Sequence, residues 1–255
     1  MIRIENLGKT FATADGDVTA LENIDVAIAD GEFVSIVGPS GCGKSTLMMC
    51  VAGLIEASAG SVTIGGTRVS GPFTQIGIVF QEALLLEWRS VLGNVLFQVE
   101  MRGLDPRAYE DRAHELLARV GLGGFERKNP WELSGGMRQR VAICRALIHD
   151  PPLLLMDEPF GALDTLTRDQ MNVDLQRLCA DTGKTAIFIT HSISEAVFLS
   201  DRVLVMTPRP GKVVADLPIT FTEARRLGIR TTPQFAEQEA KIYTIFRSIG
   251  VLRDE

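Results

Sequence analysis

The sequence predicts an α/β fold in which short buried strands alternate with helices. Residues 33–37 form a mostly apolar stretch of strand length, interrupted by Ser35 and followed directly by a Gly-rich turn and a helical stretch at 47–52. Residues 153–156 form a continuous apolar run, typical of a strand covered on both faces. Between these runs the pattern is helical from about 89 to 149, so we expect a helical subdomain inserted into an α/β core.

Strand patterns recur along the chain between Gly, Pro, Asn and Asp signals. We expect strands at 2–7, 21–28, 33–37, 61–64, 76–80, 153–156, 186–190, 202–206 and 212–217. A turn at 14–17 joins the first two strands, and Gly65-Gly66 predicts a hairpin. The turn at 208–211 joins the last two, which we expect to pair.

Capping signals mark the helices. Ser90 is placed to cap a helix over 91–101, and Asp105-Pro106 opens a helix that ends at Gly121. We expect four further helices. One follows residues 133–136 and ends at about 148, one ends at about 180, a short one begins at 193, and the last begins at Pro233.

The last of these helices carries an apolar stripe and is expected to pack on the core. The stripe consists of Phe235, Ile242, Ile245, Phe246 and Ile249. Arg225-Arg226 is expected to be a solvated surface pair.

The turn after residue 37 has the order strand, Gly-rich loop and helix N-terminus of a phosphate-binding P-loop. It consists of Gly38, Pro39, Ser40, Gly41, Cys42, Gly43, Lys44, Ser45 and Thr46. The glycines let successive N–H groups converge on phosphate oxygens, Lys44 adds a charge for the β- and γ-phosphates, and the Ser45 hydroxyl suits Mg²⁺. The alternative is a Gly-rich turn that carries Lys-Ser by chance. The strand before it and the helix after it favour nucleotide binding.

Bulk properties exclude several classes. The 255 residues are 45% hydrophobic and 23% charged, with a net charge of −6, which argues against a nucleic-acid binder. No apolar run approaches the roughly 20 residues that span a bilayer, and residues 1–5 lack the apolar stretch of a signal peptide.

The four cysteines show no Cys-x-x-Cys spacing and predict reduced cytosolic thiols. Cys50, Cys144 and Cys179 are expected as small buried residues on helices. Cys42 lies inside the phosphate loop, so alkylation there should block nucleotide binding.

An acidic pair, Asp157-Glu158, follows the buried run at 153–156. Open α/β sheets bind ligands at the carboxyl ends of their strands. We therefore expect Asp157 to hold Mg²⁺ through its water shell and Glu158 to polarise the attacking water. The alternative, a turn or helix-start acid, is less favoured beside a P-loop.

Residues 133–137, ahead of a helix, resemble the signature motif of ATP-binding-cassette (ABC) ATPases. Gln81, Asp157-Glu158, the motif 162–164 and His191 complete that family's motif order over about residues 2–217. The resemblance implies a P-loop NTPase (RecA-like) core with an antiparallel β subdomain and an inserted helical subdomain. It also implies an ATPase domain at 1–217, with its helical subdomain at about 89–149, and a C-terminal helical extension at 218–255.

The signature has Met137 in place of the family's usual Gln. With Trp88 and the turn 209–211, this is similar to importer ATPases of the nitrate/sulfonate/taurine type, although Glu87 stands where that subgroup usually has Pro.

The resemblance implies a shared active site in a head-to-tail dimer. Ser134, Gly135, Gly136 and Met137 would face the γ-phosphate of ATP held by a second copy, and Asp164 would reach across the dimer. Taken alone, this stretch is an ordinary helix cap.

Three further roles follow from the resemblance. Gln81 would contact Mg²⁺ or the attacking water, and His191 would orient Glu158 and bind the γ-phosphate. Phe11 would stack on adenine, with a core Phe as the alternative. The loop after Gln81, through Trp88, would meet a transmembrane partner, with a place in the core as the alternative.

The motifs predict a Mg-ATP-hydrolysing subunit, and the resemblance implies that it serves an importer. It would bind peripherally at the cytoplasmic face of the inner membrane, on two transmembrane permease subunits served by an extracytoplasmic solute-binding protein. Nitrate, sulfonate, taurine or a similar molecule would be the solute. The alternatives are a non-transport ABC ATPase, mechanical or regulatory, and a P-loop kinase, which would leave the signature helix and His191 unexplained.

Overall fold

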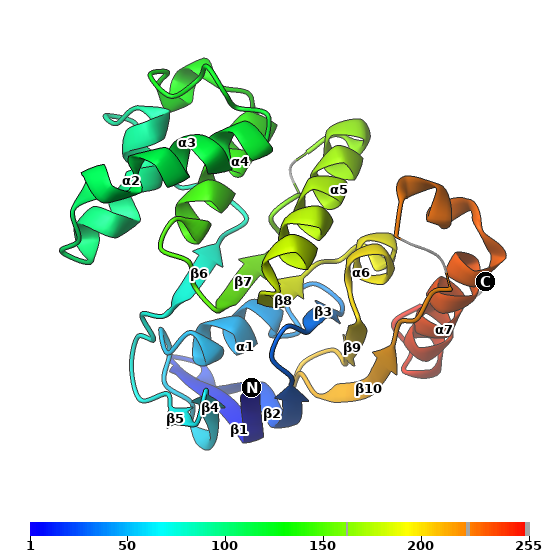
Figure 1. Ribbon diagram of the computed structural model, residues 1–255. Helices are drawn as coiled ribbons and strands as arrows, with labels where there is room; N and C mark the ends of the chain where they lie inside the picture. Colours follow the sequence, from blue (N-terminus) through cyan, green and yellow to red (C-terminus); the bar gives the residue numbers. More distant parts are fainter. Residues whose placement is uncertain (162, 223–224, 253–255) are drawn as a thin grey trace. The chain divides into compact units, whose positions relative to one another are not determined.

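The computed structural model describes residues 1–161, 163–222 and 225–252, and Figure 1 shows their elements. The chain forms two compact units: one comprises Met1–Thr74 and Cys179–Glu255, the other Gln75–Leu178. The predicted boundary at residue 217 stays a prediction.

The first unit contains an antiparallel sheet in the order β2-β1-β4-β5. Its strands are β1 (Ile2–Thr13), β2 (Gly16–Ile28), β4 (Ala59–Ile64) and β5 (Thr67–Arg68). Alternation places Ile2, Ile4 and Leu7 of β1 in the interior. The hairpin at Gly65-Gly66 is confirmed, and β1 and β2 are longer than predicted.

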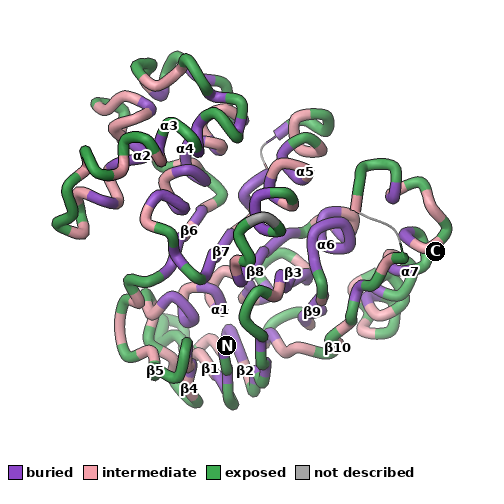
Figure 2. Tube along the Cα trace, viewed as in Figure 1, coloured by how far each residue is buried: buried purple, intermediate pink, exposed green. Residues whose placement is uncertain are grey.

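The first unit also contains a mainly parallel set of strands. β3 (Phe33–Val37) lies between β8 (Thr185–Ile189) and β9 (Arg202–Met206), parallel to both. β10 (Val213–Pro218) pairs with β9 in antiparallel fashion, as predicted. β3 and β8 are buried over their whole length, as expected of strands covered on both faces (Figure 2).

Helices complete this unit. They are α1 (Lys44–Val51), α6 (Ile193–Leu199), the 3₁₀ helix η3 (Leu227–Thr231) and α7 (Pro233–Ser248). α7 begins after Thr232, whose hydroxyl accepts from the Phe235 N–H. It contacts α6, and its residues Phe235, Ile242 and Phe246 are buried.

The expectation for Arg225 was wrong. Its side chain is only 15% exposed: Nη2 donates to the Ile219 carbonyl (3.1 Å) and to Asp201 (3.4 Å), and the guanidinium lies over the Phe221 ring. Burial lowers the pKa of Arg225. Arg226 is exposed, as predicted.

The second unit holds two parallel strands, β6 (Ile76–Val79) and β7 (Leu153–Asp157). Its helices are α2 (Val91–Met101), η1 (Pro106–Tyr109), α3 (Glu110–Arg119), η2 (Pro130–Glu132), α4 (Gly135–Leu147) and most of α5 (Thr165–Thr182). α4 packs against α2, α3 and β6.

The capping predictions are confirmed at Ser90, which accepts from the Gly93 N–H (3.1 Å), and at Asp105, which accepts from Arg107. The helix predicted over 105–121 is divided, because Tyr109 (φ −113°, ψ 0°) leaves the helical region and separates η1 from α3.

Candidate functional site

The predicted phosphate loop joins β3 to α1. Gly43 stands at the N-cap of α1 with φ 108°, a conformation that favours glycine. Because glycine has no side chain, the first amides of α1 are left for an anion, as phosphate binding requires.

Lys44 fits the same role. Its side chain is buried, and Nζ donates to the carbonyl oxygens of Gly38 (2.9 Å) and Pro39 (3.1 Å) within the loop. The ammonium is therefore already directed back over the loop, where it can exchange these carbonyls for phosphate oxygens.

Cys42 is 1% exposed, and burial raises the pKa of its thiol against the opposing charge of Lys44. The predicted effect of alkylation on nucleotide binding stays a prediction. Cys50, Cys144 and Cys179 are buried on helices, as predicted.

His191 lies at the same sheet edge as the phosphate loop. β8 is the parallel neighbour of β3, and His191 is exposed just beyond the end of β8. Loops that follow neighbouring parallel strands leave the same edge, so the first unit brings the loop and His191 together.

Phe11 occupies the exposed end of β1 opposite Val18, with the Lys9 ammonium 4.9 Å from its ring centre. At 36% exposed it is not a core residue, so the core alternative is wrong. Adenine stacking stays a prediction.

The second unit brings Gln81, Asp157 and Glu158 to one sheet edge. β6 and β7 are parallel neighbours that pair Val79 with Met156, so the residues after them leave together. A Cβ placed on Gly161 would lie 3.6 Å from Gln81 Nε2 and 3.8 Å from Glu158 Oε2, so Gly161 lies beside both side chains.

Glu158 has φ 44°, in the left-handed region that most side chains avoid. Such conformations cost of order 1–3 kcal/mol and cluster at functional sites.

The signature residues begin α4. Ser134 is the N-cap and its Oγ accepts from the Met137 N–H (3.3 Å). Ser134 and Gly135 are exposed, while Gly136 is buried, where a Cβ would lie 2.8 Å from Thr167 Cγ2 of α5. The N-terminus of α4 therefore presents amides outwards.

Asp164 directly precedes α5, and its Oδ1 accepts from the Thr167 N–H (3.1 Å). The hydrogen bonds with Thr167 lower the pKa of Asp164. Ala162, the first residue of the predicted motif 162–164, lies outside the described residues.

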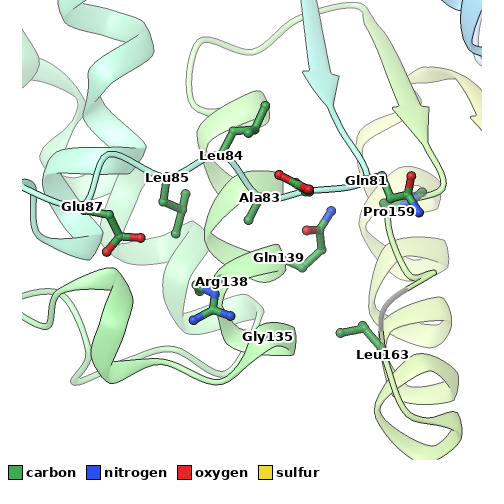
Figure 3. A pocket seen from close by; sticks show the side chains of 11 residues that line it. Gln81, Ala83, Leu84, Leu85, Glu87, Gly135, Arg138, Gln139, Pro159 and Leu163 are labelled. Carbon is green, nitrogen blue, oxygen red and sulfur yellow. The ribbon is translucent and has the colours of Figure 1, made fainter.

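A cavity of about 370 Å³ opens between the loop after β6 and the start of α4 (Figure 3). It is lined by Gln81, Glu82, Ala83, Leu84, Leu85, Glu87, Gly135, Arg138, Gln139, Pro159 and Leu163. In Figure 3, Gln81 and Pro159 lie at one end of it and Glu87 at the other. The cavity thus connects the predicted catalytic glutamine, the signature and the loop expected to meet a partner.

Sequence reasoning missed the side chains of α4 that hold this loop. Gln139 Nε2 donates to the Phe80 carbonyl (3.0 Å), and the Arg145 guanidinium donates to the carbonyls of Ala83 and Leu84 (2.7 Å each). Burial lowers the pKa of Arg145. Both residues follow the signature on one helix, and that proximity was the only signal in the sequence.

Asn94 of α2 was also missed. It is fully buried, its Oδ1 accepts from the Leu86 N–H (2.7 Å), and its Nδ2 donates to the carbonyls of Leu86, Arg89 and Ser90. The loop from 81 to 90 is therefore fixed from two helices.

Leu84 and Trp88 on this loop are 56% and 78% exposed. The alternative in which they belong to the core is wrong for these two side chains.

Ser45, Asp157 and Gln81 offer hydroxyl, carboxylate and amide oxygens, the donors that Mg²⁺ prefers. Among the described residues, no cluster of three or more His, Cys, Asp or Glu could hold a metal ion alone. Within the described part of the chain, no helix has the length and apolar character needed to cross a bilayer.

Comparison with known proteins gives consistent matches. Residues 21–161 match the family model described as "ABC transporter". The chain is 46% identical to the taurine import ATP-binding protein TauB of Rhizobium johnstonii, covering 99% of each chain, and 44% identical to TauB of Escherichia coli K12, covering 92% of each. It is 43% identical to an ABC transporter ATP-binding protein of Methanocaldococcus jannaschii, over 100% of this chain and 92% of the relative.

Two solved structures of the bacterial ABC transporter cassette MJ0796 are similar. The dimeric structure has a TM-score of 0.78 at 33% identity, and the post-hydrolysis structure bound to ADP and Pi has a TM-score of 0.76 at 31% identity. Each covers 87% of this chain and 100% of the cassette.

Proposed function

Because the chain belongs to the ABC transporter family and is one of its ATP-binding, ATP-hydrolysing subunits, we propose that it drives solute uptake as a homodimer bound to separate membrane subunits. The uptake direction is supported by the similarity to taurine import proteins. Nitrate, sulfonate, taurine or a similar small molecule is the proposed solute, delivered by an extracytoplasmic binding protein.

One observation carries the transport role: two large apolar side chains, Leu84 and Trp88, are exposed on the loop that starts at Gln81. Exposed apolar side chains on a loop fixed by Asn94, Gln139 and Arg145 suit a docking surface better than a mobile loop. We assign this surface to two transmembrane permease subunits, which places the chain peripherally at the cytoplasmic face of the membrane.

The chemistry is positioning and electrostatics. Lys44 and the amides of 41–45 neutralise charge on the transferring phosphoryl group, and Glu158 accepts a proton from the attacking water, which His191 and Gln81 orient. Ser45, Asp157 and Gln81 would hold Mg²⁺, which would supply further neutralisation of phosphate charge. Phe11 stacks on adenine.

The active site is completed by a second copy of the chain. The exposed N-terminus of α4, from Ser134 to Met137, faces the γ-phosphate of ATP held by the partner, and Asp164 reaches across the dimer. The dimeric cassette of the same family supports this arrangement.

The dimer is tested by the ATPase rate per molecule over a dilution series. The rate should rise with protein concentration, since each site needs two chains. A flat rate down to verified monomer would contradict the shared site.

The transport role is tested by purification of the tagged chain from membranes. It should retain two membrane subunits, and these should be lost in Trp88→Ala but not in Tyr243→Ala, an exposed aromatic on α7. Recovery with ribosomes or DNA instead would support the alternative, a mechanical or regulatory ABC ATPase.

A further inference from the structure

The turn that follows β9, residues 207–212, contacts the phosphate loop. We propose that this Arg209 turn is a positioning element for nucleotide binding, in which Arg209 fixes the loop backbone from outside. The proposal rests on the assignment of 38–46 as the phosphate loop.

The sheet places the two segments side by side. β3 and β9 are parallel neighbours that pair Ile36 with Leu204 and Val37 with Val205, so the loops after them leave the same edge. A Cβ placed on Gly38 would lie 3.1 Å from the Met206 Cβ and 3.2 Å from its carbonyl oxygen. The first residue of the phosphate loop is therefore in contact with the last residue of β9.

Arg209 holds the loop by a charged hydrogen bond. Its Nη2 and Nε both donate to the Gly41 carbonyl oxygen, over 3.0 and 3.3 Å. In a trans peptide the carbonyl and the following N–H point in opposite directions, so holding the Gly41 oxygen also sets the direction of the Cys42 N–H. That amide is one of those expected to meet phosphate, and in this structure it donates to the Pro39 carbonyl over 3.3 Å.

Gly211 brings the turn against the next residue of the loop. A Cβ at this position would lie 2.1 Å from the Cys42 carbonyl oxygen, so only glycine allows this approach. The Gly211 N–H donates to Ala20 (2.9 Å), and its carbonyl accepts from the Glu22 N–H (3.1 Å). The turn is thereby anchored to β2.

β2 also contacts the other end of the loop, since a Cβ on Gly43 would lie 2.8 Å from Leu21 Cδ2 and 2.9 Å from the Ala20 oxygen. The phosphate loop is thus supported by β2 and by the Arg209 turn, which are themselves hydrogen-bonded. Losing Arg209 would free the Gly41–Cys42 peptide while the sheet stays intact.

Lys212 offers a matched control. It lies in the same turn and carries the same charge, but it pairs with Glu22 of β2 (Nζ–Oε2 3.2 Å) on the surface. If Arg209 acted only through its positive charge near phosphate, removing either cation would weaken nucleotide binding to a similar extent.

Two measurements test the proposal. Arg209→Ala should raise the Kd for Mg-ATP by about 3- to 10-fold, which is the range of one ordinary hydrogen bond, because Arg209 is exposed and water weakens the contribution of its charge. It should also speed alkylation of Cys42, located by peptide mapping, while Cys144 stays protected. Arg209→Lys should fall between the wild type and Arg209→Ala, and Lys212→Ala should change neither measurement.

Gly211→Ala should act in the same direction as Arg209→Ala, because its methyl group displaces the turn from Cys42. Wild-type affinity and wild-type Cys42 labelling in Arg209→Ala would overturn the proposal, as would an equal loss of affinity in Lys212→Ala. Lys44→Ala separates the two levels of inference. If Lys44→Ala binds Mg-ATP normally, the phosphate-loop assignment fails; if it loses binding while Arg209→Ala is normal, only the role of Arg209 fails.

Discussion

Two adjacent glycines at the start of α4, Gly135 and Gly136, are expected to respond to the same substitution in opposite ways. Gly136 is buried against α5, whereas Gly135 is exposed at the helix N-terminus. Gly136→Ala should therefore reduce stability, and Gly135→Ala should reduce ATP turnover in the dimer while the fold is unaffected.

The contact distances give the size of the stability effect. A Cβ at Gly136 would lie 2.8 Å from Thr167 Cγ2, well inside the separation of about 3.5–4.0 Å that carbon atoms prefer. Thr167 cannot easily move, because its side chain is β-branched and its N–H is bound to Asp164. Because Thr167 is held in place, the overpacking cost should lie in the upper part of its usual range, at about 2–3 kcal/mol. Helix propensity returns about 1 kcal/mol, which leaves a net loss of about 1–2 kcal/mol.

Among the described residues, no atom lies within 4 Å of a Cβ placed on Gly135. Gly135→Ala should therefore keep the wild-type Tm or raise it slightly through helix propensity. Its methyl group would stand where the partner's γ-phosphate is proposed to approach. A displacement of about 1 Å there should slow turnover by about 10²-fold.

The assay is thermal unfolding and ATPase rate on both variants at a saturating protein concentration. Gly136→Ala should lower Tm by about 2–8 °C, since 1 kcal/mol corresponds to about 2–4 °C in a chain of this size. An unchanged Tm in Gly136→Ala would refute the packing argument. Wild-type turnover in Gly135→Ala would refute the proposed position of the partner's nucleotide.

Three further predictions concern catalysis, coupling and pH. Glu158→Gln should bind Mg-ATP normally, but its hydrolysis should be slower by about 10²–10⁴-fold, and gel filtration should show an ATP-bound dimer that accumulates. Wild-type turnover in this variant would exclude Glu158 as the base. Arg145→Met removes two hydrogen bonds to the loop carbonyls and should lower the free energy of unfolding by about 2–3 kcal/mol in urea titration. Arg145→Lys should recover part of this free energy. An unchanged free energy of unfolding in Arg145→Met would show that water replaces the guanidinium. Burial raises the pKa of Cys144 and of Cys179 from 9.0 to about 12. The free energy of unfolding that these protonated thiols contribute is therefore complete below pH 9 and falls as pH rises towards 12. The loss is about 1.4 kcal/mol for each thiol and each pH unit. The difference in unfolding free energy between pH 8 and pH 10.5 should therefore shrink when both are replaced by alanine, and an unchanged difference would contradict the shift.

The sequence predicted helix starts and the phosphate loop correctly, because the residues that form each of them are neighbours in the chain. Ser90 marks the start of α2 because its hydroxyl accepts an amide three residues along, and Ser134 does the same for α4. The loop from strand to helix at Lys44 was likewise visible, because its residue types and its flanking elements are adjacent in the chain.

Long-range partners of polar side chains could not be read in the same way. Arg225 looked like a surface cation, but Asp201, Ile219 and Phe221 surround it. Arg145 meets carbonyls about sixty residues earlier in the chain. Periodicity records which face of a helix is apolar, and it carries no information on which distant backbone oxygen a long side chain will reach.

The left-handed backbone at Glu158 sets stability against catalysis at a single position. Glycine adopts this conformation freely, so Glu158→Gly would relieve about 1 kcal/mol of conformational strain while removing the proposed base. Selection for heat resistance alone should therefore favour glycine at position 158 and give an inactive chain. Only selection for ATP turnover would keep the carboxylate there.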